Sequence, residues 1–231
     1  MTDVPRVFIG WDSREDIAYQ VCRSSILRHA SGSVEVRPLK QSELREQGLY
    51  RREEDPLAST EFTYTRFLTP YLAGFEGWAI FVDCDFLYTA DIQDLWAQRD
   101  PSKAVMCVQH DYQPTEATKM DGKAQTVYPR KNWSSMMLMN CGHPSTRKLT
   151  VEAVNSEGPA YLHRMLWADD AEIGALDKTW NWLEGWYAPE AAPPKAIHYT
   201  RGGPWFEAWR DVDYGALWLA ERDRVVAAGA E

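Results

Sequence analysis

Residues 78–88 read WAIFVDCDFLY, and the expected fold follows from this stretch. Trp78–Val82 is an unbroken apolar run, as a strand covered on both faces of a sheet requires. Asp83 and Asp85 come next, with Cys84 between them. Because alternate residues of an extended chain point to the same side, we expect the two carboxylates to face one point and the cysteine to face away. Three occupants of that point stay open: a metal ion, a phosphoryl group or only water.

Strands and helices are expected to alternate on both sides of this stretch. The predicted strands are Arg6–Gly10, Ser33–Leu39, Trp78–Val82, Ala104–Val108, Ser134–Met139 and Ala196–His198. The predicted helices are one over 17–30 behind a capping box of Ser13 and Asp16, then Thr60–Leu72, a short one opened by Asp91, Ser145–Val154 and Pro159–Leu166. Polar residues 41–56 predict a loop with or without a short helix, and 111–131 a mobile loop.

This alternation indicates an α/β fold with a mainly parallel central sheet flanked by helices. Residues 1–231 contain no internal repeat and no low-complexity linker, which favours a single domain.

Composition excludes several classes of protein. The net charge of −9 argues against nucleic acid as the main partner, because phosphate backbones are bound by basic surfaces. No apolar run approaches the roughly 20 residues that span a bilayer. The four cysteines are dispersed, which disfavours a disulfide framework or a zinc site, and the first residues do not resemble a secretion signal. We therefore expect a cytoplasmic protein with no membrane span.

Candidate ligands gather at predicted strand ends. In a parallel sheet, ligands bind beyond the carboxyl ends of the strands. The turn at Gly10–Asp12 and the pair Asp83 and Asp85 both follow strands, so we expect them on one rim. His198 ends another apolar strand, beside the glycines of YTRGGPWF. Two carboxylates with an imidazole suit a divalent cation, and the imidazole favours Mn²⁺, with Mg²⁺ as the alternative.

The order VFIGWD, TYTRFLTPYL, AIFVDCDFLY, NWSSMMLMNC and IHYTRGGPWF resembles the retaining GT-A glycosyltransferases of the family-8 type, the group of glycogenin and the bacterial galactosyltransferases. The resemblance covers roughly Val7 to Phe206. It implies a single Rossmann-like GT-A domain that transfers a hexosyl unit from a nucleotide sugar, a UDP-sugar first of all, to a hydroxyl acceptor with retention of configuration.

The resemblance also implies site residues. Asp83, Asp85 and His198 correspond to the metal ligands that hold the donor diphosphate. Further positions correspond to donor-binding and catalytic residues: Ile9, Gly10, Asp12 and Arg66 near the donor, and Asp170, with Asp169 as its rival, facing the reacting sugar.

The sequence departs from the family pattern in two places. The lysine expected before the late Pro-Trp is replaced by Gly203, and Arg201 is the nearby cation that could contact phosphate and act in catalysis. Trp133 stands where an asparagine is expected, with Asn132 one position away. These departures bear on the sugar and acceptor pockets more than on the metal ligands.

Two other functions remain as alternatives. A phosphatase could use the first aspartate of an Asp-x-Asp strand end as its nucleophile, although that motif normally opens its chain. A non-catalytic carbohydrate-binding module would explain the eleven tryptophans, some of which could stack on sugars. It would not explain the aspartates and His198 together.

Overall fold

The protein is described by a computed structural model that covers residues 4–53, 55, 58–111 and 129–229. Its main sheet has six strands in the order β2-β1-β3-β6-β5-β7. Their bounds are β1 Arg6–Trp11, β2 Glu35–Lys40, β3 Trp78–Val82, β5 Val105–Val108, β6 Met136–Asn140 and β7 Ile173–Leu176. Neighbouring strands are parallel except where β6 pairs with β3 and β5. The predicted α/β class with a mainly parallel sheet is confirmed.

A second sheet of three short strands stands beside the carboxyl end of β3. It has the order β4-β9-β8, with bounds β4 Phe86–Tyr88, β8 Trp182–Leu183 and β9 Ala196–His198. The strand β4 begins four residues after β3 ends, so the predicted aspartate pair lies in the connection between the two sheets.

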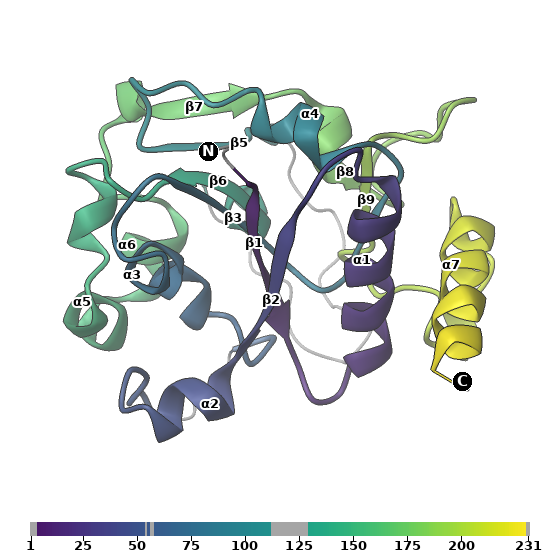
Figure 1. Cartoon of the computed structure of the whole chain (residues 1–231), viewed down its shortest axis with the longest axis horizontal. Helices are drawn as coiled ribbons and strands as arrows, with labels where there is room; N and C mark the ends of the chain where they lie inside the picture. The colour runs from purple at the N-terminus through teal and green to yellow at the C-terminus, as the bar shows by residue number, and fades with distance from the viewer. Residues whose placement is uncertain (1–3, 54, 56–57, 112–128, 230–231) are drawn as a thin grey trace.

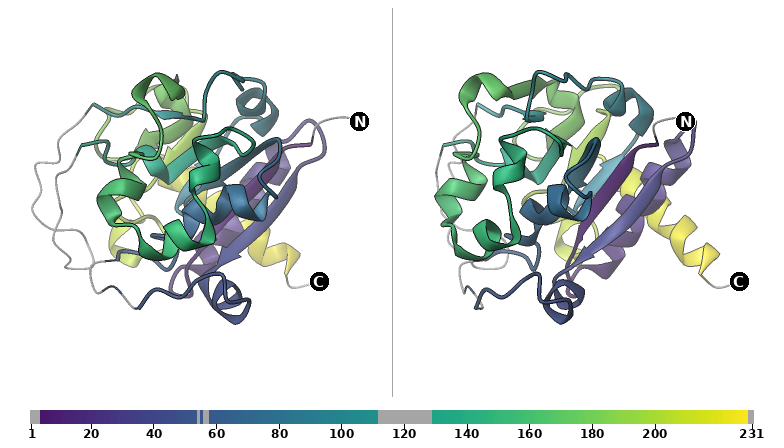
Figure 2. Two further views of the ribbon diagram at one scale, coloured as in Figure 1. Left: turned by 90° about the vertical axis from the view of Figure 1, so that its left-hand side faces the viewer. Right: turned by 60° about the vertical axis from the view of Figure 1, so that its left-hand side comes forward.

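Helices cover the main sheet on both sides. Their bounds are α1 Asp16–His29, α2 Gln41–Glu46, α3 Thr69–Leu72, α4 Ile92–Trp96, α5 Val151–Ser156, α6 Pro159–His163 and α7 Gly215–Ala228. The long helices α1 and α7 lie side by side, while α3, α5 and α6 gather across the sheet from them (Figure 1). The right-hand view of Figure 2 shows the same arrangement.

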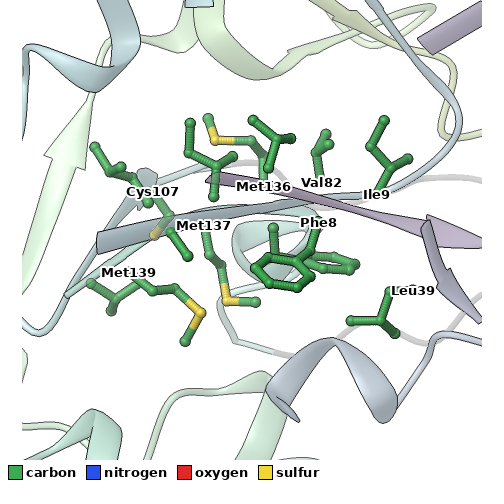
Figure 3. Packing of buried hydrophobic residues seen from close by; sticks show 14 of the residues in the cluster. Phe8, Ile9, Leu39, Val82, Cys107, Met136, Met137 and Met139 are labelled. Carbon is green, nitrogen blue, oxygen red and sulfur yellow. The ribbon is translucent and has the colours of Figure 1, made fainter. Parts of the chain in front are cut away.

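The core follows the period-two pattern of the strands. Ile9 pairs with Val82, and Val82 pairs with Met136, so one row of side chains crosses three strands. Phe8 and Met137 belong to the opposite face. Figure 3 shows the first three side chains on one side of the strands and the other two on the other. All five are at most 5% exposed, because helices cover both faces.

Three expectations about local structure are wrong. The capping box of Ser13 and Asp16 does not form: α1 starts at Asp16 with Glu15 as N-cap, and the Ser13 hydroxyl donates to Glu61 instead. The helix expected over 60–72 is shorter, a 3-10 turn over Thr65–Leu68 followed by α3, because residues 61–64 form turns. The helix expected over 145–154 divides into a 3-10 turn at Thr146–Lys148 and α5. Most of the loop expected over 111–131 lies outside the described residues.

Candidate functional site

The predicted metal ligands meet at the junction of the two sheets. Asp83 follows β3, Asp85 precedes β4, and His198 ends β9. Each offers one ligand atom, and these atoms all lie within 4.8 Å of one another. Asp85 Oδ2 is 3.3 Å from His198 Nε2. Two carboxylate oxygens and an imidazole nitrogen at this spacing form a donor set that fits a divalent cation such as Mn²⁺.

The physical reason for this convergence differs from the expected one. Cys84 and Asp85 form a turn rather than continuing the extended strand, so strand alternation does not bring the carboxylates together. The antiparallel register does: Phe86 on β4 pairs directly with His198 on β9, which sets the imidazole beside Asp85. Cys84 is fully buried, in keeping with a packing role.

The His198 side chain is held by contacts within the protein. Its side chain is 3% exposed, and its ring stacks on Phe86 with the centroids 4.3 Å apart. Nδ1 lies 2.9 Å from Oδ1 of Asn181, at the end of a 3-10 turn over Lys178–Asn181. Nε2 is the ring nitrogen that faces Asp85.

Arg66 contacts one member of the cluster. Its guanidinium is 2.8 Å from Asp83 Oδ1 and also donates to the backbone carbonyls of Ser134 and Phe62. Arg66 is 6% exposed. The structure therefore brings Arg66 together with the predicted metal ligands, as a partner of Asp83.

A cavity of about 670 Å³ opens over the cluster. Apart from the cluster and Arg66, its wall carries charged groups, small polar groups and aromatic rings, among them Glu15, Asp55, Ser59, Thr60, Lys131, His163, Arg164, Arg201, Trp205 and Phe206. A volume in this range accommodates a medium-sized organic ligand. The cations and the acidic cluster could together hold a ligand that carries phosphates.

Arg201 stands at the wall, as expected for a phosphate contact. Its Nη2 lies 3.7 Å from Oε2 of the buried Glu184, and its guanidinium lies over the rings of Trp186 and Trp209. Burial raises the pKa of Glu184, and the nearby charge of Arg201 opposes that rise. Gly185 leaves room for the guanidinium, since a Cβ there would lie 1.8 Å from Nη2 of Arg201.

Glu15 is a wall residue that sequence reasoning missed. Burial raises its pKa to about 7, and the negative charges of Asp85 and Asp12 add to the rise. Its carboxylate accepts a hydrogen bond from the Cys84 thiol at 3.7 Å. Its place as N-cap of α1 carries no sequence signal for a site, because α1 lies far from Asp85 in sequence.

Three residues expected at the donor lie outside the cavity wall. Ile9 is fully buried in the core. A Cβ at Gly10 would lie 2.5 Å from the Phe62 ring, so the glycine serves close packing. Asp12 is fully buried and accepts hydrogen bonds from Arg14 and from the backbone of Glu61, which lower its pKa against the effect of burial. Of the three, Asp12 orders the turn after β1.

Asp170 also lies apart from the cluster. Its side chain is 87% exposed and pairs with Arg130 at 2.5 Å, and it is not among the residues of the cavity wall. Asp169 is the N-cap of the 3-10 turn over Asp170–Glu172, in a capping box with Glu172. The segment between Trp167 and β7 is thus ordered by local capping rather than directed at the cavity.

Comparisons with known proteins agree with this architecture. No family model matches the chain. Among solved structures, glycosyltransferase GlyE of Streptococcus pneumoniae matches with a TM-score of 0.64 at 15% identity, covering 94% of this chain and 60% of that one. Galactosyltransferase LgtC, in complex with donor and acceptor sugar analogs, matches with a TM-score of 0.59 at 11% identity, covering 95% of each chain. Mouse xyloside xylosyltransferase 1 matches with a TM-score of 0.56 at 14% identity, covering 85% of this chain and 98% of that one.

These likenesses show that the chain has the GT-A fold of glycosyltransferases. Within the described residues, no helix is long and apolar enough to cross a membrane. A relative by sequence is Protein CDI of Arabidopsis thaliana, 57% identical over 222 residues that span 94% of this chain and 86% of the relative. At that identity and coverage, the chain belongs to the same family as Protein CDI.

Proposed function

We propose that the protein is a metal-dependent glycosyltransferase that moves a hexosyl unit from a nucleoside diphosphate sugar to a hydroxyl acceptor. The observation that carries the proposal is the cluster of Asp83, Asp85 and His198 in the wall of a large cavity on a GT-A fold. The LgtC structure, with donor and acceptor sugar analogs, supports the same substrate classes for this chain. The family-8 resemblance adds a UDP-sugar donor and retention of configuration to the proposal.

The chain's residues take distinct roles in this mechanism. Asp83, Asp85 and His198 would hold Mn²⁺, and the ion would supply Lewis-acid stabilisation of negative charge on a leaving diphosphate. Arg201 contacts the same phosphates and is pre-oriented by Glu184 and the two tryptophan rings. Arg66 holds the Asp83 carboxylate in place.

Asp170 keeps its proposed role only if its segment moves when substrates bind. A glycosyl transition state has oxocarbenium character, which a nearby carboxylate stabilises. Glu15 and Asp55 are carboxylates already in the wall. Comparing Asp170→Asn, Glu15→Gln and Asp55→Asn for turnover at saturating donor identifies which of the three assists the reacting sugar.

The test of the function is calorimetric titration of UDP into the protein with and without Mn²⁺. We expect binding that depends on Mn²⁺ in the wild type and is lost in Asp85→Ala, whose thermal unfolding stays near that of the wild type. Asp94→Ala removes an aspartate from α4, outside the cavity wall, and serves as the matched control. Retained UDP binding in Asp85→Ala contradicts the metal assignment.

Two further measurements separate the alternative functions. Release of inorganic phosphate from a generic phosphomonoester would favour a phosphatase. Binding of free sugars without nucleotide or metal would favour a carbohydrate-binding module. Screening nucleotide sugars for metal-dependent hydrolysis then identifies the donor.

A further inference from the structure

The backbone turn Asn132–Ser135 is linked by hydrogen bonds to two members of the cluster, directly to Asp83 and through Asn181 to His198. The carbonyl of Ser135 accepts a hydrogen bond from the backbone N–H of Asp83 at 2.9 Å. The side chain of Ser135 contacts Asn181, which in turn contacts His198. The turn depends on Asn132, whose φ of 62° lies in the left-handed region where asparagine is among the best tolerated residues.

The hydrogen bonds of this network have only one consistent direction. The Ser135 hydroxyl donates its single hydrogen to the carbonyl of Asn132 at 2.7 Å. Its oxygen can then only accept from Asn181, at 2.9 Å, so Asn181 must present its NH₂ group on that side. The same NH₂ donates to the carbonyl of Asn132 at 3.3 Å. The carbonyl oxygen of the Asn181 side chain therefore faces His198.

This direction decides which ring nitrogen of His198 carries a proton. Nδ1 lies 2.9 Å from an oxygen that can only accept, so Nδ1 must carry the hydrogen. The lone pair of a neutral imidazole is then on Nε2, the nitrogen that faces Asp85. Metal binding requires a lone pair on the ligating nitrogen, and the other ring N–H of a metal-bound histidine is almost always held by a second residue.

We propose that Asn181 is a positioning residue, which fixes His198 in the tautomer that presents Nε2 to the cation through hydrogen bonds set by Ser135 and Asn132. The inference rests on the metal assignment in the proposed function. Asn181 is itself fully buried, so no solvent molecule can readily replace its oxygen.

The first test reads the tautomer directly and does not depend on metal or activity. In ¹⁵N-histidine-labelled protein, long-range ¹H–¹⁵N spectra assign the proton of His198, with His198→Gln identifying its signals. We expect a protonated Nδ1 in the wild type and in Asn181→Asp, which keeps an accepting oxygen. We expect a neutral Nε2–H tautomer in Asn181→Leu. A bare Nδ1 in the wild type overturns the inference, whatever the protein's reaction is.

The second test measures the consequence for the metal. Mn²⁺ is titrated alone, and its binding is followed by the electron paramagnetic resonance signal of the free ion. We expect Asn181→Leu to bind Mn²⁺ about 10–100-fold more weakly, the usual cost of losing such a partner, and Asn181→Asp to retain binding. Asn155→Leu is the matched control, because Asn155 makes three hydrogen bonds around α5, outside the cavity wall. Equal loss in both leucine variants contradicts the positioning role.

The two tests separate the proposals. A protonated Nδ1 that Asn181→Leu abolishes, in a protein that binds no Mn²⁺, supports the network and overturns the metal function. Mn²⁺ binding that is unchanged in Asn181→Leu supports the metal site and overturns the positioning role.

Discussion

Replacing Arg66 by methionine should make stability depend strongly on Mn²⁺. The substitution keeps an apolar stem in the core but leaves the Asp83 carboxylate, whose side chain is 14% exposed, without its cation at 2.8 Å. Breaking a buried ion pair in this way costs about 3–5 kcal/mol. Because Asp83 keeps some contact with solvent, we take the lower end of this range and expect loss of the pair to reduce the free energy of unfolding by about 3 kcal/mol. The two hydrogen bonds to the carbonyls of Ser134 and Phe62 add about 1–3 kcal/mol.

Mn²⁺ can restore only the first of these contributions. A cation beside Asp83 compensates the carboxylate for the loss of Arg66, whereas the two carbonyls lose their side-chain donor and, within the described residues, only that of Phe62 keeps a donor, the backbone N–H of residue 66. A chain of this length loses about 2–4 °C of Tm per kcal/mol. We therefore expect Arg66→Met to unfold about 8–24 °C below the wild type without metal. Saturating Mn²⁺ should raise its free energy of unfolding by up to about 3 kcal/mol more than it raises that of the wild type.

The assay is urea unfolding at fixed pH, with and without Mn²⁺. Arg28→Met is the matched control, because Arg28 pairs with the buried Glu221 at 2.7 Å on the α1–α7 contact, away from the cluster. That variant should lose stability, yet gain no more from Mn²⁺ than the wild type does. If Mn²⁺ stabilises Arg66→Met and the wild type equally, Asp83 does not contribute to a cation site.

Three further predictions follow from other parts of the chain. Gly10→Ala should lower the free energy of unfolding by about 1–3 kcal/mol, because the added Cβ would meet the buried Phe62 ring. Urea unfolding measures this loss, and an unchanged midpoint contradicts the close packing. Burial lowers the pKa of His163 to about 3, so below pH 6.5 the unfolded chain binds a proton that the folded chain does not. His163 should therefore lower the free energy of unfolding by about 2 kcal/mol at pH 5 relative to pH 7.5. Urea unfolding at the two pH values measures this contribution, and His163→Gln should remove it. Arg201→Ala should weaken UDP far more than uridine in calorimetry, and equal losses exclude a phosphate contact.

The sequence predicts the strands better than the helices. Trp78–Val82 was expected with the bounds that the structure has, because a strand buried on both faces is an unbroken apolar run. The strands β4, β7 and β8 were missed because runs of two to four residues lack a periodic signal. The helix α7 was missed because its buried face includes Glu221, which pairs with Ser24 and Arg28 on α1. A buried glutamate carries no apolar signal.

The candidate site was predictable where it depends on strand ends and not where it depends on hydrogen bonds. Asp83, Asp85 and His198 follow apolar runs, so their meeting at one rim could be expected from topology. Asn181 and Glu15 carry no such signal. Asn181 donates a hydrogen bond to Ser135, which lies 46 residues earlier in the sequence, and this contact exists only after both segments have folded.

The proposed metal ligands stand at strand ends of two sheets, and backbone hydrogen bonds hold them in place. The N–H of Asp83 donates to Ser135 on the main sheet's side, and the carbonyl of Asp85 accepts from the N–H of Tyr199, the residue after β9. The register of Phe86 with His198 completes the link. Since these bonds do not involve the carboxylates, removing the Asp85 carboxylate should abolish ion binding without separating the sheets. The ion's contribution is thus expected in ligand affinity more than in folding, because backbone hydrogen bonds organise the segments that carry its ligands.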